Sequence, residues 1–532
     1  MPFKSLLGIG LAGGLTFLSA CGNANSFSGS GSEPNASFAK AIEAADIDGD
    51  DFVEVCHTPP GNPDNRHTIV VGAAAAEQHL RHGDVLGVCA DDDSADSILL
   101  TVDAGADFTV IGGDDATLTG TVMVVAGDFD PADAVLVWEQ VDGPTAATSS
   151  DVATMNVETN GLEGELTFRL TASTPNGSAS ASDEVVVTVV PPEIVAVVSA
   201  KWHNVALWNN GKISGWGWNR YGQLGDGSID DDVVSVDGGL KHTVVAKTDG
   251  TVWTFGQNAL SSSAVPVQVP GVADAVQVAA LHTGVLALDG QGTVWGLSDG
   301  LGDYCDLAES VSLDVEGAVV AVEVLGLPEH IVAISAGGRH ALALDSDGTA
   351  WVWGSRFGCT PWAVMNNVAQ VAAGTSDSCI FRLNDGTVWS MGFNLHGQLG
   401  NGTMISNYDT PEPVVGLSGI VDVAVGDRHT GFLGEDGTLY MAGWNRYCQL
   451  GLEDEVDPVE REFGADNATP IALAVGDFAL ISGGSTHSLG VHRDNSLWGW
   501  GLNTTGQLSG RTLTDLPGTV CMPLAIELPE SE

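Results

Sequence analysis

Between residues 97 and 190, hydrophobic and polar residues alternate in short runs that are typical of half-buried strands. Val135–Val141 and Leu166–Thr171 are two such runs, and turn sequences such as Asp142-Gly143-Pro144 separate them from their neighbours. Several short strands over this span predict a β-sandwich domain at residues 97–190. Trp138 is its expected core anchor.

From residue 194 to the end, a strand–turn–strand pattern recurs at a fixed register. A His is followed seven residues later by Asp-Gly or a close relative, and Gly follows after seven more. A register held seven times indicates a repeat architecture, with tight hairpins at the Asp-Gly turns. The intervals between copies are unequal, so we expect the additional length in loops. The copies begin at His203, His242, His282, His340, Ser378, His429 and His487.

The repeated histidines could suggest catalysis or metal binding. One His at the same register of each unit favours a structural role instead, in which the side chain hydrogen-bonds to the backbone of the neighbouring unit. Ser378 stands at this position in the fifth copy, so the His can be replaced. The repeated glycines are expected to serve turns and close packing.

These features closely resemble the regulator-of-chromosome-condensation repeat, whose consensus contains Ala-Gly-Gly-x-His, Asp-Gly, Trp-Gly-x-Asn and Gly-Gln-Leu-Gly at these offsets. Residues 336–340, 216–219, 222–225 and 397–400 carry parts of it. The resemblance covers residues 194–532 and implies an all-β fold, a seven-bladed β-propeller of four-stranded sheets around a central channel. We expect the C-terminal strand, residues 523–528, to complete the first blade and close the ring.

The predicted sandwich also resembles a known family. Trp138–Pro144, Phe168–Thr171, Asn176-Gly177 and Asp183–Val185 are similar to polycystic-kidney-disease-type immunoglobulin-like domains. The resemblance implies an immunoglobulin-like sandwich that serves as a spacer or adhesion unit, and this segment shows no catalytic set.

Residues 1–21 resemble a bacterial lipoprotein signal peptide. Lys4 precedes a short apolar stretch, Leu6–Leu18, which is too short to span a bilayer as a stable helix. Leu18-Ser19-Ala20-Cys21 resembles a lipobox, which implies cleavage before Cys21 and attachment of lipid to it. We expect residues 22–45 to form a flexible tether. Gly22, where Asp would suggest inner-membrane retention, points to the outer membrane or cell surface.

Residues 46–90 form a small Cys/His-rich module, in which Ala73–His82 has good helix formers. Export favours a disulfide between Cys56 and Cys89, with the histidines packed nearby. A zinc site is the alternative, and a module with neither feature is the third. The acidic run 46–51 lacks the Gly and Glu of a calcium loop, so it indicates an acidic turn. Weak metal candidates are His57, His67, His79 and His82.

Two further cysteines, Cys305 and Cys359, follow the closing glycines of consecutive repeats. The loops that carry them should be neighbours, so we expect a Cys305–Cys359 disulfide. The pairing among Cys379, Cys448 and Cys521 stays open, and a Cys448–Cys521 bond is one alternative.

The net charge is −51, from 18 Lys and Arg against 69 Asp and Glu. This charge disfavours nucleic acid and anionic membrane surfaces, whose phosphates need cations. The sequence contains no phosphate-binding loop of the Gly-x-x-x-x-Gly-Lys type and no His-Glu-x-x-His. We therefore expect neither an enzyme nor a cofactor.

The resemblance implies several activities. Founding members of the family exchange guanine nucleotide on a nuclear GTPase and bind chromatin, which export and acidity argue against here. Other members are secreted bacterial proteins that bind and inhibit β-lactamase. We therefore expect a surface-anchored, non-enzymatic, monomeric protein that binds an unknown protein partner through a propeller face or the loops 298–324 and 452–470. The alternatives are an adhesion or carbohydrate-binding protein, a propeller hydrolase or lyase, and a guanine nucleotide exchange factor-like protein.

Overall fold

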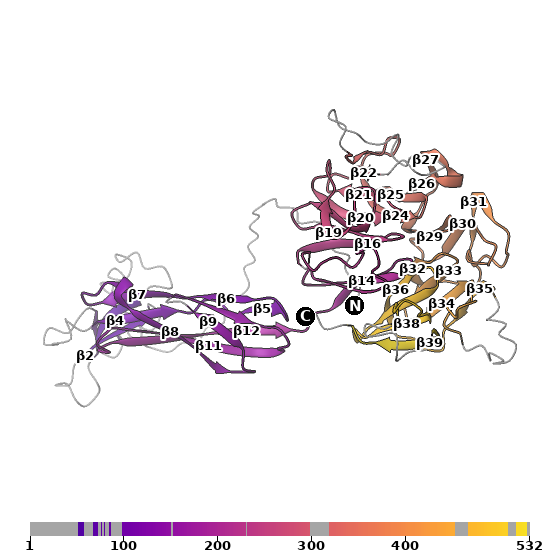
Figure 1. Cartoon of the computed structure of the whole chain (residues 1–532). Helices are drawn as coiled ribbons and strands as arrows, with labels where there is room; N and C mark the ends of the chain where they lie inside the picture. Colours follow the sequence, from indigo (N-terminus) through magenta and orange to yellow (C-terminus); the bar gives the residue numbers. More distant parts are fainter. Residues whose placement is uncertain are drawn as a thin grey trace, which may run out of the picture. The chain divides into compact units, whose positions relative to one another are not determined.

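The computed structural model describes residues 52–57, 67–72, 76, 79, 84–86, 98–150, 153–229, 231–297, 319–452, 466–508 and 518–528 (Figure 1). Nearly all regular structure in these ranges is β, which confirms the predicted all-β class; the exceptions include two 3-10 turns, η2 (Pro131–Asp133) and η3 (Ser355–Phe357). Cys21, the predicted signal peptide and the tether lie outside these ranges. No described helix has the length and apolar character to cross a membrane.

The chain divides into two compact units. One contains Met1–Val102, Val122–Val135 and Thr171–Ser182, and the other contains Asp103–Thr121, Leu136–Leu170 and Asp183–Glu532. The first unit begins with a small antiparallel sheet in the order β2-β1-β3. Its strands are β1 (Phe52–His57), β2 (His67–Gly72) and β3 (Val85–Leu86). Ala76 and His79, the described part of the expected helix, are helical.

Residues 99–190 form three small sheets, in the orders β4-β7, β6-β10-β9 and β5-β12-β11-β8. Trp138 on β8 is buried, and Gly120 makes room for it and for Leu170, because a Cβ at Gly120 would lie 1.9 Å from Leu170 Cδ2. The strands are β4 (Leu99–Asp103), β5 (Phe108–Ile111), β6 (Ala116–Thr119), β7 (Thr121–Ala126), β8 (Val135–Asp142), β9 (Ala147–Ser150), β10 (Thr154–Glu158), β11 (Gly164–Ser173) and β12 (Ser180–Val190).

Seven antiparallel sheets follow along residues 194–526 of the described chain (Figure 1). The first is β13 (Ile194–Ser199), β14 (His203–Trp208) and β15 (Ile213–Gly217); the second is β16 (Val233–Gly238), β17 (His242–Lys247), β18 (Val252–Gln257) and β19 (Ser262–Gln268); the third is β20 (Ala275–Ala280), β21 (Val285–Asp289), β22 (Val294–Leu297) and β23 (Val322–Glu323). The fourth is β24 (Ile331–Gly337), β25 (His340–Asp345), β26 (Ala350–Gly354) and β27 (Gly358–Met365); the fifth is β28 (Val368–Ala373), β29 (Ser378–Leu383), β30 (Val388–Gly392) and β31 (Asn407–Pro413). The sixth is β32 (Ile420–Val425), β33 (His429–Gly434), β34 (Leu439–Gly443) and β35 (Asn467–Ala472); the seventh is β36 (Phe478–Gly483), β37 (His487–His492), β38 (Leu497–Leu502) and β39 (Thr519–Ile526).

The second strand of each sheet is almost completely buried, because neighbouring sheets cover both of its faces. The strands are therefore continuous apolar runs instead of alternating ones. Glycine ends the third strand where the backbone approaches its neighbour closely. At Gly256, φ is 95° and a Cβ would lie only 2.4 Å from the Lys241 carbonyl oxygen, so other residues cannot fit.

The ring closes where the first sheet packs against the seventh. Both sheets contribute to one apolar cluster, which includes Ile194, Ala206 and Trp216 on one side and Leu489 and Ile526 on the other. No described strand pairs across this junction. Side-chain packing and a few polar contacts therefore hold the ring closed.

The expectation that the C-terminal strand completes the first blade is wrong. β39 pairs with β38, in the register Leu497↔Ile526, and is the fourth strand of the seventh sheet. The reason is local: the open edge of β38 lies immediately before β39 in the chain, and β13 already supplies the inner strand of the first sheet. The first sheet has three strands among the described residues.

Asn495 makes polar contacts that cross the closing junction. At six junctions, the first strand donates a backbone N–H to the carbonyl of the preceding turn glycine, as Val368 does to Gly348 at 2.9 Å. At the closing junction the turn residue is Asn495, with φ 68°, and its Oδ1 accepts from Ile194 N at 2.8 Å. Its Nδ2 also donates to Pro192 O at 3.1 Å. The one turn without glycine thus uses a side chain to hold the incoming strand.

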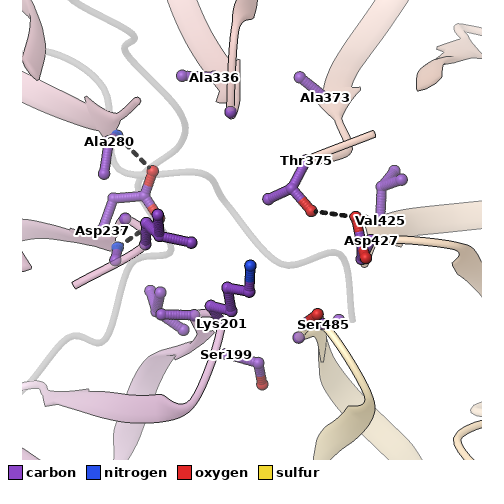
Figure 2. Close-up of a pocket in the computed structure, with 18 of the residues that line it drawn as sticks. Ser199, Lys201, Asp237, Ala280, Ala336, Ala373, Thr375, Val425, Asp427 and Ser485 are labelled. Carbon is purple, nitrogen blue, oxygen red and sulfur yellow. Dashed lines mark hydrogen bonds between the residues drawn. The ribbon is translucent and has the colours of Figure 1, made fainter. Parts of the chain in front are cut away.

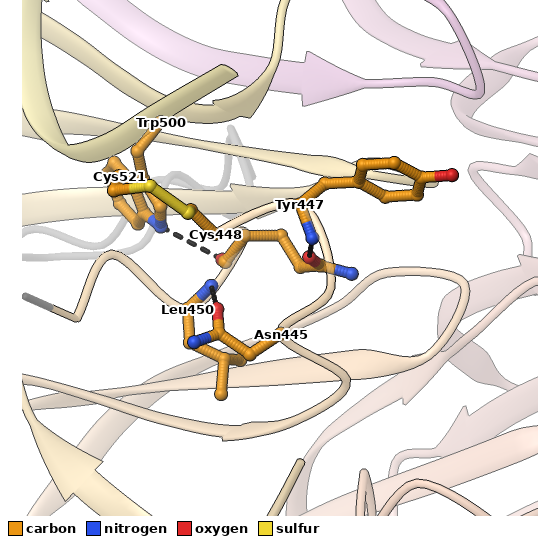
Figure 3. The surroundings of a disulfide bond; sticks show 7 residues. Asn445, Tyr447, Cys448, Leu450, Trp500 and Cys521 are labelled. Atoms are coloured by element: carbon orange, nitrogen blue, oxygen red, sulfur yellow. Dashed lines mark hydrogen bonds between the residues drawn. A yellow bond between two sulfur atoms is a disulfide. The ribbon is translucent and has the colours of Figure 1, made fainter. Parts of the chain in front are cut away.

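A disulfide between Cys448 and Cys521 joins β39 to the loop after β34 (Figure 3). It lies beside the buried Trp500, whose Nε1 donates to Gln449 O at 2.9 Å. This pairing was one of those left open by the sequence. It ties the last strand of the chain to the preceding sheet.

We expect Asn495→Gly to lower the free energy of unfolding by about 1–2 kcal/mol, because two hydrogen bonds across the closing junction are lost. Glycine is the more favourable residue at φ 68°, so backbone strain would act in the opposite direction. Urea unfolding of the full chain measures the change. The control is Asp274→Gly, which relaxes another left-handed residue, with φ 54°. An Asn495→Gly variant as stable as the native chain would contradict the role of this side chain.

We expect the double variant Cys448→Ser, Cys521→Ser to unfold at lower urea concentration. The two cysteines are 73 residues apart, and closing a loop of this size stabilises by up to about 4 kcal/mol in the chain-entropy model. Met522→Ser, at an exposed neighbour on β39, is the control for changing the strand surface. Equal unfolding midpoints for the double variant and the native chain would show that the bond is dispensable.

Candidate functional site: the axial cavity and its rim

Three of the repeated histidines form the same kind of polar link between neighbouring sheets. His203 Nε2 lies 3.0 Å from Thr243 Oγ1 of the next sheet, and that hydroxyl donates to Gln223 O at 2.7 Å. Because the hydroxyl proton is used on Gln223, the imidazole must donate from Nε2. His429 makes the equivalent contact with Ser488, at 2.8 Å, and Ser488 donates to Gln449 O.

The third link spans the closing junction. His487 Nε2 lies 2.6 Å from Asn204 Oδ1 in the first sheet, and Asn204 Nδ2 donates to Gln507 O at 2.8 Å. An amide oxygen can only accept, so this imidazole also donates from Nε2. The contact that joins the last sheet to the first is therefore the same as that at internal junctions. We call these His–polar side chain–Gln carbonyl contacts the inter-sheet links.

Other junctions vary the arrangement. His242 Nε2 contacts Gly284 O at 3.2 Å without an intermediary. At the junction of the fifth and sixth sheets, where Ser378 replaces His, Thr430 Oγ1 of the sixth sheet still donates to Gln398 O at 2.7 Å. His340 is buried against Phe357, and its Nδ1 lies 3.6 Å from Asp377 Oδ1.

His282 does not lie at the position that we expected it to hold in the third copy of the repeat. The turn of this sheet is at Gly292, with φ 88°, two residues later than the expected Asp289-Gly290. The position equivalent to the other histidines is therefore Gly284. His282 instead lines the axial cavity, where its backbone N–H donates to Gly338 O at 2.9 Å. The third sheet keeps the eight-residue spacing from the linking position to the turn, and His282 lies two residues before that position.

The axial cavity has a volume of about 220 Å³ and is lined by the first strands of all seven sheets and by the turns that follow them (Figure 2). Lys201 extends into it, and Asp427 accepts a hydrogen bond from Thr375 Oγ1 at 3.0 Å. Burial lowers the pKa of His282, and the nearby Arg339 and Lys201 act in the same direction. Burial raises the pKa of Asp237 to about 6, although backbone N–H groups of Ala280 and Gly238 oppose this.

The cavity does not contain a catalytic arrangement among its described residues. Asp237 accepts the backbone N–H groups of Ala280 and Gly238, at 2.7 and 2.8 Å, and so links two strands. The Ser482 hydroxyl accepts from Ser199 N at 2.8 Å. Among the described residues, no lining hydroxyl is hydrogen-bonded to His282, so we find no nucleophile paired with a base there.

The rim of the cavity carries stacked cations and aromatic rings. Because the second and third strands of each sheet are antiparallel, the second begins at the end of the sheet where the third finishes. The loops before the second strand and after the third therefore lie on one face. Lys201 Nζ lies 4.7 Å from the Trp202 ring, and Lys241 Nζ lies 4.7 Å from the Tyr221 ring. Arg428 and Arg356 lie 5.0 and 5.4 Å from the rings of Trp444 and Tyr408. We call this face the rim.

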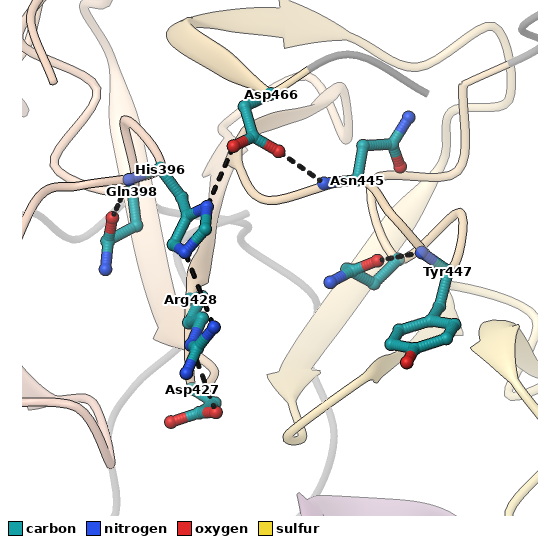
Figure 4. A network of polar contacts seen from close by, with 8 residues as sticks. His396, Gln398, Asp427, Arg428, Asn445, Tyr447 and Asp466 are labelled. Carbon is teal, nitrogen blue, oxygen red and sulfur yellow. Dashed lines mark hydrogen bonds and ion pairs between the residues drawn. The ribbon is translucent and has the colours of Figure 1, made fainter. Parts of the chain in front are cut away.

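A chain of polar contacts links the fifth and sixth sheets on the rim (Figure 4). His396 Nδ1 lies 2.8 Å from Asp466 Oδ2, and Arg428 Nη1 lies 3.4 Å from His396 Nε2. Arg428 Nε also lies 3.7 Å from Asp427 at the cavity. The network holds the Arg428 guanidinium against Trp444 while its side chain stays 38% exposed.

The rim also exposes apolar side chains. Leu395 and Ile405, in the loop between β30 and β31, are 60% and 72% exposed, and Met404 is 44% exposed. Leu395 is the third residue after the closing Gly392. At the same position after the third strand, the first and sixth sheets expose Arg220 and Arg446. The rim therefore offers cationic, aromatic and apolar groups together.

The Cys/His module brings two of its candidate histidines together with a carboxylate. His57 Nδ1 and His79 Nδ1 lie 2.8 and 2.9 Å from the same oxygen, Oδ2 of the buried Asp84. The side chains of His67 and His82 lie outside the described residues. Sequence reasoning missed Asp84, although Asp84 follows His82 by two residues in the same acidic, His-rich segment.

Two other predicted disulfides each fall partly outside the described chain. Cys56 and Cys359 are disulfide-bonded, whereas their expected partners, Cys89 and Cys305, lie outside the described residues. Cys379 is a free, buried thiol, and burial raises its pKa.

We expect the buried repeat histidines to make the fold sensitive to acid. Burial lowers the pKa of His203 and His487 to about 3, and that of His242, His340 and His429 to about 4. These values are below the unfolded value of about 6.5, so the stabilisation is complete above pH 6.5 and is lost as the pH falls toward 4. Each His adds about 1.4 kcal/mol per pH unit to this slope.

The variant His429→Gln tests this expectation, because its unfolding free energy should depend less steeply on pH, by about one proton. Urea unfolding between pH 4 and 7 gives both slopes. His330→Gln, at a side chain that is 71% exposed, should leave the slope unchanged. The expectation fails if His429→Gln retains the native pH dependence.

The seven-sheet region matches a known family. Models of the regulator of chromosome condensation (RCC1) repeat match residues 385–433 and, in a second form, residues 331–356, 420–449 and 478–507. These segments contain the second and third strands of the fourth, sixth and seventh sheets and the third strand of the fifth. They include all three residues of the His429–Ser488–Gln449 link.

The chain is similar to the ultraviolet-B receptor UVR8 of Arabidopsis thaliana, with 29% identity over 379 residues, which cover 62% of this chain and 81% of the receptor. Prp20p from Saccharomyces cerevisiae is 19% identical, with a TM-score of 0.49, over 63% of this chain and 87% of that chain. The PKD domain of human KIAA0319 is 23% identical, with a TM-score of 0.16, over 20% of this chain and 93% of that domain. With both TM-scores below 0.5, the propeller fold rests on the seven sheets and their shared cavity. The repeat matches show that the C-terminal region carries regulator of chromosome condensation repeats, and they support the family that the sequence resemblance indicated.

Proposed function

We propose that this chain is a non-enzymatic, surface-anchored scaffold that binds a protein partner through the rim. The observation that carries the proposal is the set of four cations stacked on aromatic rings at one end of the sheets. In a chain with net charge −51, such a concentration of cations favours a partner with acidic groups. The exposed Leu395 and Ile405 provide apolar contact area beside them.

The physical chemistry of the rim suits protein binding. Aromatic and Arg side chains are enriched at the centres of protein interfaces, because they bury large areas and make directed contacts. Stacking also limits the freedom of Arg428 and Lys241 before a partner arrives, which reduces the entropy lost on binding. The cavity behind the rim is small, and its described residues include no paired nucleophile and base, which favours binding over catalysis.

The remaining parts of the proposal concern architecture and location. The seven sheets form a seven-bladed propeller, and the segment 97–190 is an immunoglobulin-like spacer between it and the Cys/His module. Lipid on Cys21 would anchor a monomer at the cell envelope. Support comes from the shared cavity, from the buried Trp138 and from the Leu18–Cys21 motif.

The double variant Arg220→Glu, Arg446→Glu should abolish capture of the partner. Both residues are exposed on the rim, and each change replaces attraction for acidic groups by repulsion. The measurement is affinity capture by the full soluble chain from cell-surface extracts, with identification of bound proteins. The matched control is Lys247→Glu, Arg493→Glu, which makes the same charge change at the turn end of the sheets.

Three outcomes would contradict this proposal. Equal loss of capture in both double variants would indicate a non-specific charge effect. Retention of glycans in place of protein would favour the adhesion or carbohydrate-binding alternative. Turnover of a substrate panel by the native chain would favour an enzyme.

A further inference from the structure

We propose that His57, His79 and Asp84 form a binding site for a divalent transition-metal ion such as Zn²⁺. The three side chains place ligand atoms within 4.8 Å of one another. They come from the end of β1, from a helical residue and from the residue before β3. An ion at this position would cross-link three segments of a small module. The site is separate from the rim and does not depend on the function proposed for it.

The donor set is that of a zinc site. Two imidazoles and one carboxylate are a common ligand set when a fourth position is left for water or another ligand. A tetrahedral Zn²⁺ with bonds of about 2.0–2.1 Å separates neighbouring ligand atoms by about 3.3 Å. The His57 and His79 Nδ1 atoms lie 2.8 and 2.9 Å from Asp84 Oδ2, so an outward movement of about 0.5 Å would admit the ion.

The local structure holds the three ligands in place. The side chain of Asp84 is 1% exposed, and the backbone N–H of Asp84 donates to His79 O at 3.3 Å, which fixes the segment between them. The two imidazole rings meet edge to face, with centroids 5.2 Å apart and planes at 89°. A buried carboxylate oxygen approached by two imidazole nitrogens favours a positive charge at that point.

The site remains open to an incoming ion. The His57 and His79 side chains are 26% and 31% exposed, so solvent reaches both imidazoles. Cys56 is adjacent to His57 on β1, and side chains alternate between the faces of a strand. The disulfide-bonded Cys56 therefore lies on the other face, and we infer a site without sulfur ligands.

Zinc binding to the full, metal-free chain tests the proposal. Titration against a chromophoric chelator at high salt, which suppresses weak binding to the acidic surface, should detect one equivalent of tightly bound Zn²⁺. We expect His79→Gln and Asp84→Asn each to lower the affinity by at least about 100-fold, since even indirect partners of a zinc ligand contribute 10–100-fold. His330→Gln, an exposed His outside the module, should bind as the native chain does.

Cobalt spectroscopy gives a second readout that does not depend on comparing variants. Co²⁺ in a tetrahedral nitrogen and oxygen site should show visible d–d bands without the near-ultraviolet charge-transfer band of a thiolate ligand. Absence of tight Zn²⁺ binding in the native chain would overturn the proposal. So would native affinity in both ligand variants, or a thiolate band in the Co²⁺ form. Far-ultraviolet circular dichroism of each variant checks that the chain remains folded.

Discussion

The propeller depends on the packing of its first sheet against its seventh. No described strand crosses this junction, so closure must come from side chains. An apolar cluster packs residues of both sheets together across the junction. The His487–Asn204–Gln507 link repeats the contact that His203 and His429 make at internal junctions. The ring therefore closes through the same kind of link that joins the sheets at two internal junctions, together with apolar packing.

Much of the ring could be predicted from the sequence because its spacing is tied to backbone geometry. In the first, second, fourth, sixth and seventh sheets, the eighth residue after the repeat His lies in the turn and has a positive φ. A glycine or asparagine at that position and a glycine at the end of the third strand both follow from steric limits. Such constraints act on single residues and are visible without a structure.

The third sheet shows where spacing alone misleads. Asp289-Gly290 has the expected composition, yet Gln291-Gly292 makes the turn, which leaves Gly284 at the linking position and moves His282 to the cavity. The sequence did contain a better signal, because Gly-Thr-Val-Trp follows the turn at Gly250, Gly292 and Gly386 alike. The placement of β39 and the meeting of Asp84 with His57 could not be found this way. They depend on contacts between residues that no local pattern relates.

The inter-sheet links and the rim are adjacent in the chain, and this arrangement connects stability with function. Lys241, Arg339 and Arg428 each directly precede a buried repeat histidine, His242, His340 and His429. Two neighbouring side chains on a strand point to opposite sides of it. A histidine held between two sheets therefore also fixes the backbone of the Lys or Arg that precedes it. The buried imidazole must stay neutral, whereas the cation on the rim keeps its charge in contact with water. The repeat can therefore vary its rim residues freely while each link preserves the backbone that presents them.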